Sequence, residues 1–329
     1  VDEPNVFDES GSFEIKGKLE VTAPVLGQEL QYSGPTEPVS WKATGDSGTF
    51  NQVRLSFSST GLGGPWRKMD DSGDGYTPWA NVTGTNTYTW TVPDRVSDEC
   101  YIKVSSDDWQ NISDDGSAFK IKGNLTLQYP DGGEDLLVGA NPVITWTKSS
   151  AVNTVQIDID YGTGSGWETI SATASAGLGT SGQYTLWTVA DKISPVTTTG
   201  SAKIRLTDKT NAGISLVSTG TEFKVRGAIN SVASPALNDT WVVGEITRVV
   251  TWTAVGTVTP VIIYYAPDGV WANRQVLASS VAAGSGVRSY AVSSVPDNVS
   301  SGFTAKIWVC DQRDITAVQN QSNTFKVKG

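Results

Sequence analysis

A pentapeptide of the form Phe-x-(Ile/Val)-x-Gly recurs four times and constrains the fold of this chain more than any other feature. Its copies begin at Phe13, Phe119, Phe223 and Phe325, with spacings of 106, 104 and 102 residues. A second marker, (Val/Ile)-(Ser/Thr)-Trp, ends at Trp41, Trp146 and Trp252. Three further markers recur between these copies in the same order. Such a period predicts tandem modules of about 100 residues rather than one large domain.

The repeated segments have the pattern of β-strands. In residues 53–58 and 155–160, apolar residues alternate with polar ones, which places one row of side chains on a core and the other in water. Pro-Asp pairs at Pro93 and Pro296 are turn signals after a strand. Several short strands separated by turns predict an antiparallel β-sandwich with the repeated tryptophan in its core. No segment predicts a helix of two turns or more.

The second repeat carries Pro130-Asp-Gly-Gly-Glu134, then Gly139, then Ile144-Thr-Trp146. Together with the Tyr-Thr-Trp-Thr-Val-Pro-Asp strand at residues 88–94, this pattern resembles the Ig-like domain of the Ser-Thr-rich GPI-anchored membrane family. That family occurs in fungal cell-wall proteins and, as tandem copies, in long bacterial surface proteins. The paired glycines are lost in the first and third repeats. The resemblance implies Ig-like sandwiches in an extracellular, cell-surface array, and it supplies no catalytic residue.

The predicted fold is therefore all-β, with three tandem Ig-like antiparallel β-sandwiches in a rod and one extra N-terminal strand. The predicted modules are residues 18–123, 124–227 and 228–329. Single glycines join them without a Pro- or Ser-rich linker, which predicts limited bending. Residues 1–17 hold a fourth copy of the closing strand. This segment is either the end of a preceding repeat or a strand that docks on another molecule through Phe13 and Ile15, since strand addition supplies main-chain hydrogen bonds.

Composition argues against several classes of function. The chain has no histidine, which removes the usual general base near neutral pH and the commonest metal ligand. Its formal net charge of −10 argues against a nucleic-acid partner. No apolar run reaches the roughly 20 residues that span a bilayer. We expect no enzyme, although a hydrolase with paired carboxylates needs no histidine and stays open. Cys100 and Cys310 are predicted to be isolated, semi-buried thiols.

An acidic loop of the first repeat, residues 70–75, is the sharpest local signal for a ligand. Asp70, Ser72 and Asp74 place oxygens at positions 1, 3 and 5 of a calcium loop, and position 6 is glycine. Position 12 is Asn81 rather than a bidentate glutamate, so a solvated acidic loop is the alternative. A second acidic loop holds Asp107, Asp108, Asp114 and Asp115. Calcium is the only cofactor that the sequence suggests.

Three tryptophans fall outside the repeat pattern, namely Trp79, Trp109 and Trp308. Trp308 takes a strand position that Lys103 and Arg205 occupy in the other repeats, and this position should face outward. Exposed tryptophans can stack on sugars or fill a partner's pocket. Packing against a neighbouring module is the alternative. Six Asn-x-Ser/Thr sequons are candidate glycosylation sites, at Asn81, Asn111, Asn124, Asn238, Asn298 and Asn320.

These patterns predict a structural subunit or segment of an extracellular surface filament, stalk or giant adhesin. Head-to-tail docking of the spare strand is one route to its assembly. The expected partners are copies of the chain or adjacent repeats of a longer chain, together with cell-wall or surface glycans. The alternative function is a set of carbohydrate-binding Ig-like modules of a larger cell-surface protein.

Overall fold

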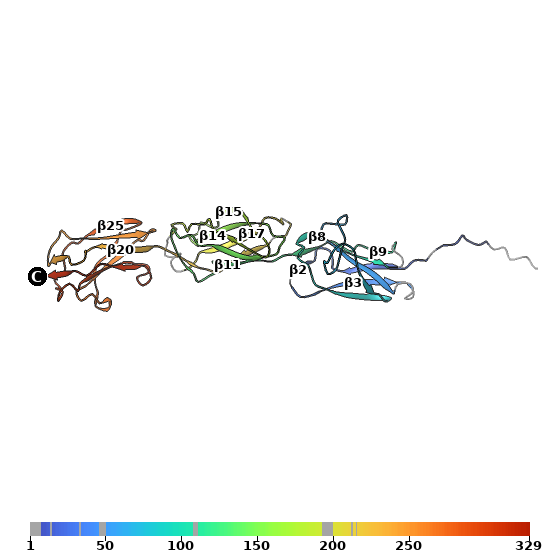
Figure 1. Ribbon diagram of the computed structural model, residues 1–329, viewed down its shortest axis with the longest axis horizontal. Helices are drawn as coiled ribbons and strands as arrows, with labels where there is room; N and C mark the ends of the chain where they lie inside the picture. The colour runs from blue at the N-terminus through green and yellow to red at the C-terminus, as the bar shows by residue number, and fades with distance from the viewer. Residues whose placement is uncertain are drawn as a thin grey trace, which may run out of the picture. The chain divides into compact units, whose positions relative to one another are not determined.

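The computed structural model shows an all-β chain (Figure 1). It describes residues 8–13, 15–32, 34–45, 51–107, 111–192, 200–211, 213–214 and 216–329. Every regular element in these residues is a β-strand, except the three-residue 3-10 turn η1 (Trp271–Asn273). In this part of the chain, no helix is long and apolar enough to cross a membrane.

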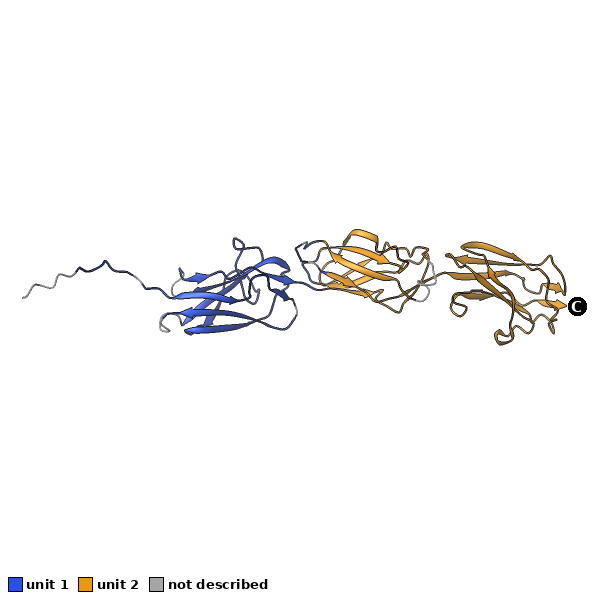
Figure 2. Ribbon diagram, turned by 180° about the vertical axis from the view of Figure 1, so that it is seen from behind, with its two compact units in different colours: residues 1–124, 149–152, 210–216 blue, residues 125–148, 153–209, 217–329 orange. Residues whose placement is uncertain are grey.

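The chain divides into two compact units (Figure 2). Unit 1 comprises residues 1–124, 149–152 and 210–216, and unit 2 comprises residues 125–148, 153–209 and 217–329. Each β-sheet is built from strands of a single predicted module, so the first sandwich lies in unit 1 and the other two lie in unit 2.

The first module consists of two sheets, one antiparallel and one mixed. One has the strand order β1-β3-β7, and the other has the order β2-β10-β8-β4-β5, with β6 added to β4 and β9 to β8. The strands are β1 (Lys18–Ala23), β2 (Glu29–Gln31), β3 (Glu37–Thr44), β4 (Gln52–Ser58), β5 (Arg67–Lys68), β6 (Thr77–Ala80), β7 (Gly84–Trp90), β8 (Ser97–Ser106), β9 (Ser113–Asp114) and β10 (Phe119–Lys122). The closing strand β10 runs parallel to β2 and antiparallel to β8.

The second module repeats this plan with sheets β11-β13-β16, β12-β19 and β15-β14-β17-β18. Its strands are β11 (Leu125–Tyr129), β12 (Asp135–Leu137), β13 (Ile144–Lys148), β14 (Thr154–Asp160), β15 (Glu168–Ser175), β16 (Ser181–Tyr184), β17 (Lys203–Asp208), β18 (Val217–Thr219) and β19 (Lys224–Arg226). The closing strand β19 again pairs in parallel with the short second strand β12.

The third module has sheets β20-β22-β25, β21-β28 and β24-β23-β26-β27. Its strands are β20 (Ala228–Ser234), β21 (Thr240–Val242), β22 (Val249–Val255), β23 (Val261–Ala266), β24 (Gln275–Val281), β25 (Gly286–Ala291), β26 (Lys306–Asp311), β27 (Gln319–Gln321) and β28 (Lys326–Lys328). In all three modules, a three-stranded sheet faces a larger layer that is closed by the last strand. Each module is therefore an Ig-like sandwich.

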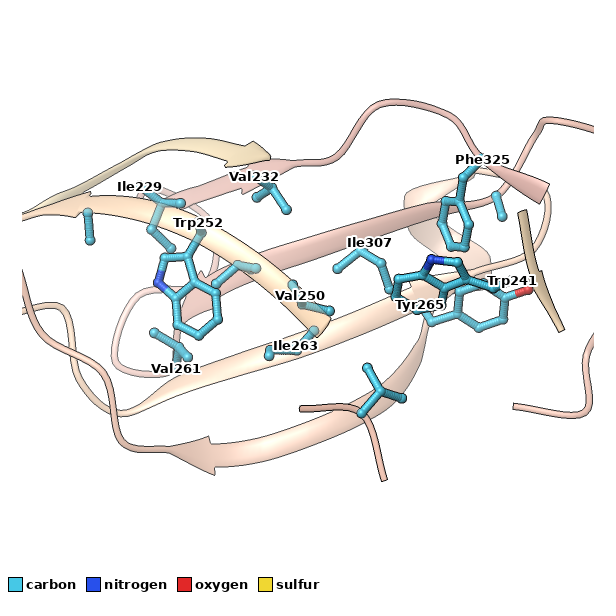
Figure 3. Close-up of a cluster of buried hydrophobic side chains, with 14 of the residues drawn as sticks. Ile229, Val232, Trp241, Val250, Trp252, Val261, Ile263, Tyr265, Ile307 and Phe325 are labelled. Carbon is cyan, nitrogen blue, oxygen red and sulfur yellow. The ribbon is translucent and has the colours of Figure 1, made fainter. Parts of the chain in front are cut away.

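The repeated aromatic residues form the cores, as the sequence predicts. The tryptophans of the second marker, Trp41, Trp146 and Trp252, are all buried. The closing phenylalanines of the three modules, Phe119, Phe223 and Phe325, are buried as well. In the third module, Phe325 lies near Trp241 and Tyr265, with ring centroids 5.0 and 6.2 Å away (Figure 3). The strand that repeats in the sequence is thus the strand that closes each core.

The turn before the second strand explains how the third repeat dispenses with the paired glycines. Gly27 and Gly133 adopt φ values of 72° and 79° in this turn. Asn238 takes the same position with φ of 62°. Asparagine tolerates this left-handed region better than other residues with a Cβ. The three backbone N–H groups donate to the carbonyls of Ala118, Glu222 and Thr324 at 2.8, 2.9 and 3.0 Å.

Candidate functional site

A shallow groove of about 260 Å³ lies over the outer face of the larger sheet of the first module. Its floor comes from β4 and β8, whose apolar side chains face the core and whose alternate side chains therefore face outward. In the strand register, Arg54 lies opposite Ser105, and Ser56 lies opposite Lys103. Ser113 of β9 extends the floor beside Ser105.

Aromatic rings line the groove above this floor. The guanidinium of Arg54 lies 4.3 Å from the ring centroid of Tyr76, and the ammonium of Lys103 lies 4.5 Å from that of Trp66. The cations also have carboxylate partners outside the residues that line the groove. Arg54 pairs with Asp107, and Lys103 with Asp115 at 3.1 Å. The charged residues that line the groove are both cationic, although the chain as a whole is acidic.

The same four floor positions carry different chemistry in each module. In the second module they hold Gln156, Asp158, Arg205 and Thr207, with Asp158 opposite Arg205. In the third module they hold Ile262, Tyr264, Trp308 and Cys310, with Tyr264 opposite Trp308. The outer face therefore changes from cationic to a compensated ion pair and then to an aromatic cluster, while the core keeps its pattern.

Asp158 is the anion of the second module's outer face and is only 1% exposed. Burial acts to raise the pKa of its carboxyl group. Hydrogen bonds from Gln156, Arg205 and Thr169, together with the charge of Arg205, outweigh burial and lower that pKa below its usual value. The guanidinium of Arg205 also lies 4.3 Å from the ring centroid of Trp167. The polar side chains on this face of the second module are therefore hydrogen-bonded to one another.

Trp308 does face outward from its strand, but the expectation that it is exposed is wrong. Only 6% of it is accessible, because its ring packs against Trp271 with centroids 5.5 Å apart. Tyr264 and Ile315 belong to the same cluster. Arg274 supplies the cation that the strand position lacks, with its guanidinium 3.7 Å from the ring centroid of Trp271. Trp308 is thus a packing residue of this face and offers no ring to a ligand.

The other two candidate stacking residues have different outcomes. Trp79 lies on β6 and is 40% exposed. The ring of Trp79 packs perpendicular to the ring of Tyr88, with the ring centroids 4.8 Å apart. Trp79 does not line the groove over β4 and β8. Trp109 lies outside the described residues.

The acidic loop predicted to bind calcium carries ion pairs with a nearby arginine. Asp74 pairs with Arg67 at 3.1 Å, and Arg67 also pairs with the neighbouring Asp71. Asp70 accepts a hydrogen bond from the backbone N–H of Ser72, and hydrogen bonds from Ser72 lower the pKa of Asp70. Within the described residues, no group of three or more acidic or cysteine side chains is placed to hold a metal ion. Calcium binding by Asp70, Ser72 and Asp74 stays a prediction, in which the cation would compete with Arg67 for Asp74.

The second acidic loop has a structural role that recurs in every module. Asp114 accepts a hydrogen bond from the backbone N–H of Val21 in the first strand, at 2.6 Å. The equivalent residues of the other modules are Ser218, which accepts from Leu127, and Asn320, which donates to the carbonyl of Ile229. Each of these side chains ties the strand before the closing strand to the first strand of its module.

The sequons fall into two groups. Asn81 is 5% exposed, and its side-chain oxygen accepts a hydrogen bond from Nε1 of the core residue Trp41 at 2.8 Å. Because the side chain of Asn81 is buried, we expect no glycan on this residue in the folded chain. Asn320 uses its side-chain nitrogen within its module, and Asn124 accepts from Gln31 at 2.7 Å. The remaining sequons, Asn111, Asn238 and Asn298, are exposed.

The N-terminal segment has no strand partner within the described part of this chain, and its docking on another molecule through Phe13 and Ile15 stays a prediction. Residues 8–13 and 15–17 have no strand pairing. Phe13 and Ile15 are 77% and 90% exposed, whereas the closing phenylalanine of every module is buried. The place that such a strand takes in an Ig-like sandwich is filled in all three modules, by β10, β19 and β28.

The two cysteines are free and fully buried rather than semi-buried. Burial raises the pKa of Cys100 to about 11 and that of Cys310 to about 12. Because a thiolate is the reactive form, a thiol reagent at pH 8 should label neither cysteine in the folded chain and both in urea. Rapid labelling without urea would contradict this burial. Since both folded-state pKa values lie above the ordinary 9.0, the thiols' contribution to stability should be lost between pH 9 and 12.

An aspartate at one end of the sandwich accepts hydrogen bonds from a loop of the next repeat. Within unit 1, the Asp94 carboxylate accepts from the backbone N–H of Ser150 at 2.7 Å. Within unit 2, Asp191 accepts from the N–H and the hydroxyl of Thr257, at 2.9 and 2.7 Å. Ser150 and Thr257 both follow the strand of the core tryptophan. The equivalent aspartate of the third repeat, Asp297, is exposed.

The groove residues were missed by the sequence reasoning, although one signal pointed to them. Trp66, Trp167 and Trp271 follow a Gly-rich turn in each repeat. In every module this tryptophan lies against an outward-facing residue of β8 or of the equivalent strands β17 and β26. These residues are Lys103, Arg205 and Trp308. The alternation of polar residues in β4 and β8 identifies the outward positions. Their pairing across the two strands is visible only in the structure.

Comparisons with known proteins yield structural neighbours only. No protein-family model matches the chain, and no curated protein is similar to it. The I-band fragment I67–I69 of titin aligns over 96% of the chain and 100% of its own length, with 9% identity and a TM-score of 0.31. The four N-terminal Ig domains of Dscam1 isoform 6.9 align over 95% of this chain and 73% of theirs, with 8% identity and a TM-score of 0.28. Dimeric latent PorU from Porphyromonas gingivalis aligns over 94% of this chain and 34% of its own, with 11% identity and a TM-score of 0.21. At these scores, the Ig-like assignment rests on the strand order and the cores described above.

Proposed function

We propose that this chain is a structural segment of an extracellular surface filament, stalk or giant adhesin built from tandem Ig-like modules. The observation that carries the proposal is the recurrent aspartate at the end of the sandwich. Asp94 and Asp191 occupy the same repeat position, and both accept the backbone N–H of a loop in the following repeat. A chain of independent binding modules has no need of the same contact at the same position twice.

The proposal accounts for further features of the chain. Only Gly123 and Asn124 separate β10 from β11, and only Gly227 separates β19 from β20. The acidic balance of the chain favours solubility at a cell surface. The candidate partners are copies of the chain or adjacent repeats of a longer chain. Asp297 would accept the corresponding loop of such a module.

Electron microscopy of the native material tests this function. We expect continuous filaments or stalks with an axial repeat, and antibodies against the chain should decorate them along their length. Light scattering of the isolated chain shows whether it self-associates. Native material that consists only of separate, unassembled molecules with no array on the surface would contradict the proposal.

The N-terminal segment is the second element of the proposed assembly. Docking through Phe13 and Ile15 requires a sandwich whose closing-strand position is open, or an accessible sheet edge, because the closing strands of this chain are in place. If the segment docks in this way, Phe13→Asp should reduce end-to-end association in light scattering, since a charge cannot enter the core position of a closing phenylalanine. Phe13→Leu is the matched control and should associate normally. Normal assembly of Phe13→Asp would restrict the segment to a linker role.

Carbohydrate binding is a second candidate function, and the groove over β4 and β8 of the first module supports it. Its lining combines aromatic rings, serine hydroxyls and two cations. Aromatic faces and hydroxyl groups are suited to sugar rings.

A further inference from the structure

We propose that the groove over β4 and β8 of the first module binds a sugar that carries a carboxylate, such as a uronic acid unit of an acidic polysaccharide. This inference rests on the second candidate function, carbohydrate binding, and is independent of the structural one. It moves the expected sugar site away from Trp79, Trp109 and Trp308 to the outer face formed by Arg54, Lys103 and their neighbours.

The comparison between modules shows what the groove lacks. In the second module, Asp158 lies on the floor opposite Arg205 and neutralises that cation. In the first module, the corresponding position opposite Lys103 is Ser56. The floor of the first module therefore has no carboxylate opposite Lys103, whose ammonium pairs instead with Asp115, outside the groove lining, at 3.1 Å. The ammonium has three N–H donors, so a carboxylate brought by a ligand can accept from another of them while Asp115 keeps its contact.

The third module shows the other way to complete this face. There Trp308 replaces the cation, and the aromatic cluster around Trp271 covers the floor. In the first module, Trp66 lies against Lys103, but the floor position opposite Lys103 holds a serine rather than an aspartate or an aromatic ring, and Tyr76 is exposed. Of the three equivalent faces, this one is both cationic and open.

The remaining lining residues favour a sugar over a simple anion. Ser56, Ser105 and Ser113 can each donate and accept hydrogen bonds to ring hydroxyls. Trp66 and Tyr76 provide apolar walls. The volume of about 260 Å³ is slightly below the range of about 300–1,000 Å³ typical for drug-sized ligands, which suits one sugar unit of a longer chain.

Titration of the full chain with defined oligosaccharides tests the inference. The probes are uronate-containing oligosaccharides, neutral oligosaccharides of the same length, and inorganic sulfate, with binding measured by calorimetry or by NMR. We expect the uronate probes to bind and the neutral probes and sulfate to bind at least tenfold more weakly. Binding should weaken as salt is raised, because the charges are partly exposed.

Two variants place the binding in the groove. Lys103→Gln should weaken uronate binding about tenfold or more, the size expected for a lost hydrogen bond to a charged group. Tyr76→Ala should weaken it as well, and Tyr76 is exposed enough for the fold to tolerate the change. Lys203→Gln is the matched control, because Lys203 also pairs with a carboxylate, Glu222 at 3.2 Å, on the second module. It should leave binding unchanged.

The possible outcomes separate the two claims. Binding of neutral oligosaccharides as tightly as uronates would overturn the acidic-sugar assignment but leave carbohydrate binding standing. Sulfate that binds as tightly as uronates would reduce the groove to an anion site and overturn the inference. Uronate binding that Lys103→Gln and Tyr76→Ala leave unchanged would also overturn it. Absence of binding by every probe would remove both the inference and the second candidate function.

Discussion

Replacing Phe119 with alanine should lower the free energy of unfolding of the first module by about 3–5 kcal/mol, the usual cost of emptying an aromatic core position. Phe119 is 1% exposed, and its ring lies 6.1 Å from that of Trp90. Urea denaturation followed by tryptophan fluorescence measures the change. The modules should give separate transitions, so only one of them should move.

The same substitution in the N-terminal copy of the motif is the control. Phe13→Ala should change the free energy of unfolding by no more than about 0.5 kcal/mol, because the side chain is largely exposed. The same substitution in two copies of the pentapeptide is thus expected to cause a large loss of stability at Phe119 and almost none at Phe13. A large loss in Phe13→Ala would show that the terminal segment packs against the first module.

The second large effect is expected at Asp158, the buried member of the ion pair on the outer face of the second module. Asp158→Ala should lower the free energy of unfolding by about 2 kcal/mol, because the donors Gln156 and Thr169 and the partly exposed Arg205 lose a charged hydrogen-bond acceptor. The double variant Asp158→Leu/Arg205→Leu should recover most of this loss, since neither charge remains. A double variant that is less stable than Asp158→Ala would show that the outer face depends on the polar network itself.

The contribution of Asp158 to stability should depend on pH. The folded-state pKa of Asp158 lies below its usual value, so the group contributes stability above the unfolded-state pKa and loses it as pH falls through the folded-state pKa. The difference in stability between the natural chain and Asp158→Ala should therefore shrink as pH is lowered below about 4. A difference that stays constant from pH 6 to pH 2 would contradict the lowered pKa.

Sequence periodicity predicts the cores well because core positions obey a rule that repeats. Trp146 and Phe223 recur at fixed places in alternating strands, and an inward position in a sandwich leaves few choices. The left-handed turn was harder to foresee, since Asn238 replaces glycine while keeping the backbone conformation. A repeat can therefore lack the glycine of this motif and still form the same turn.

The candidate site was less predictable because it depends on partners that are distant in sequence. Alternation correctly placed Trp308 on the outer face, but its cover comes from Trp271 in the 3-10 turn η1 and from Arg274, the residue after that turn. Asn81 has the glycosylation pattern, yet its partner Trp41 lies 40 residues away. A sequon records only three adjacent residues and carries no information about burial.

The parallel pairing of the second and last strands has a mechanical consequence. In each module, a three-residue ladder joins the strand near its beginning to the strand at its end, as in β2–β10 and β21–β28. Tension that pulls the two ends of a module apart acts along these strands in opposite directions. It therefore shears the rungs of the ladder together instead of peeling them one by one, and the module resists stretching until several hydrogen bonds break at once.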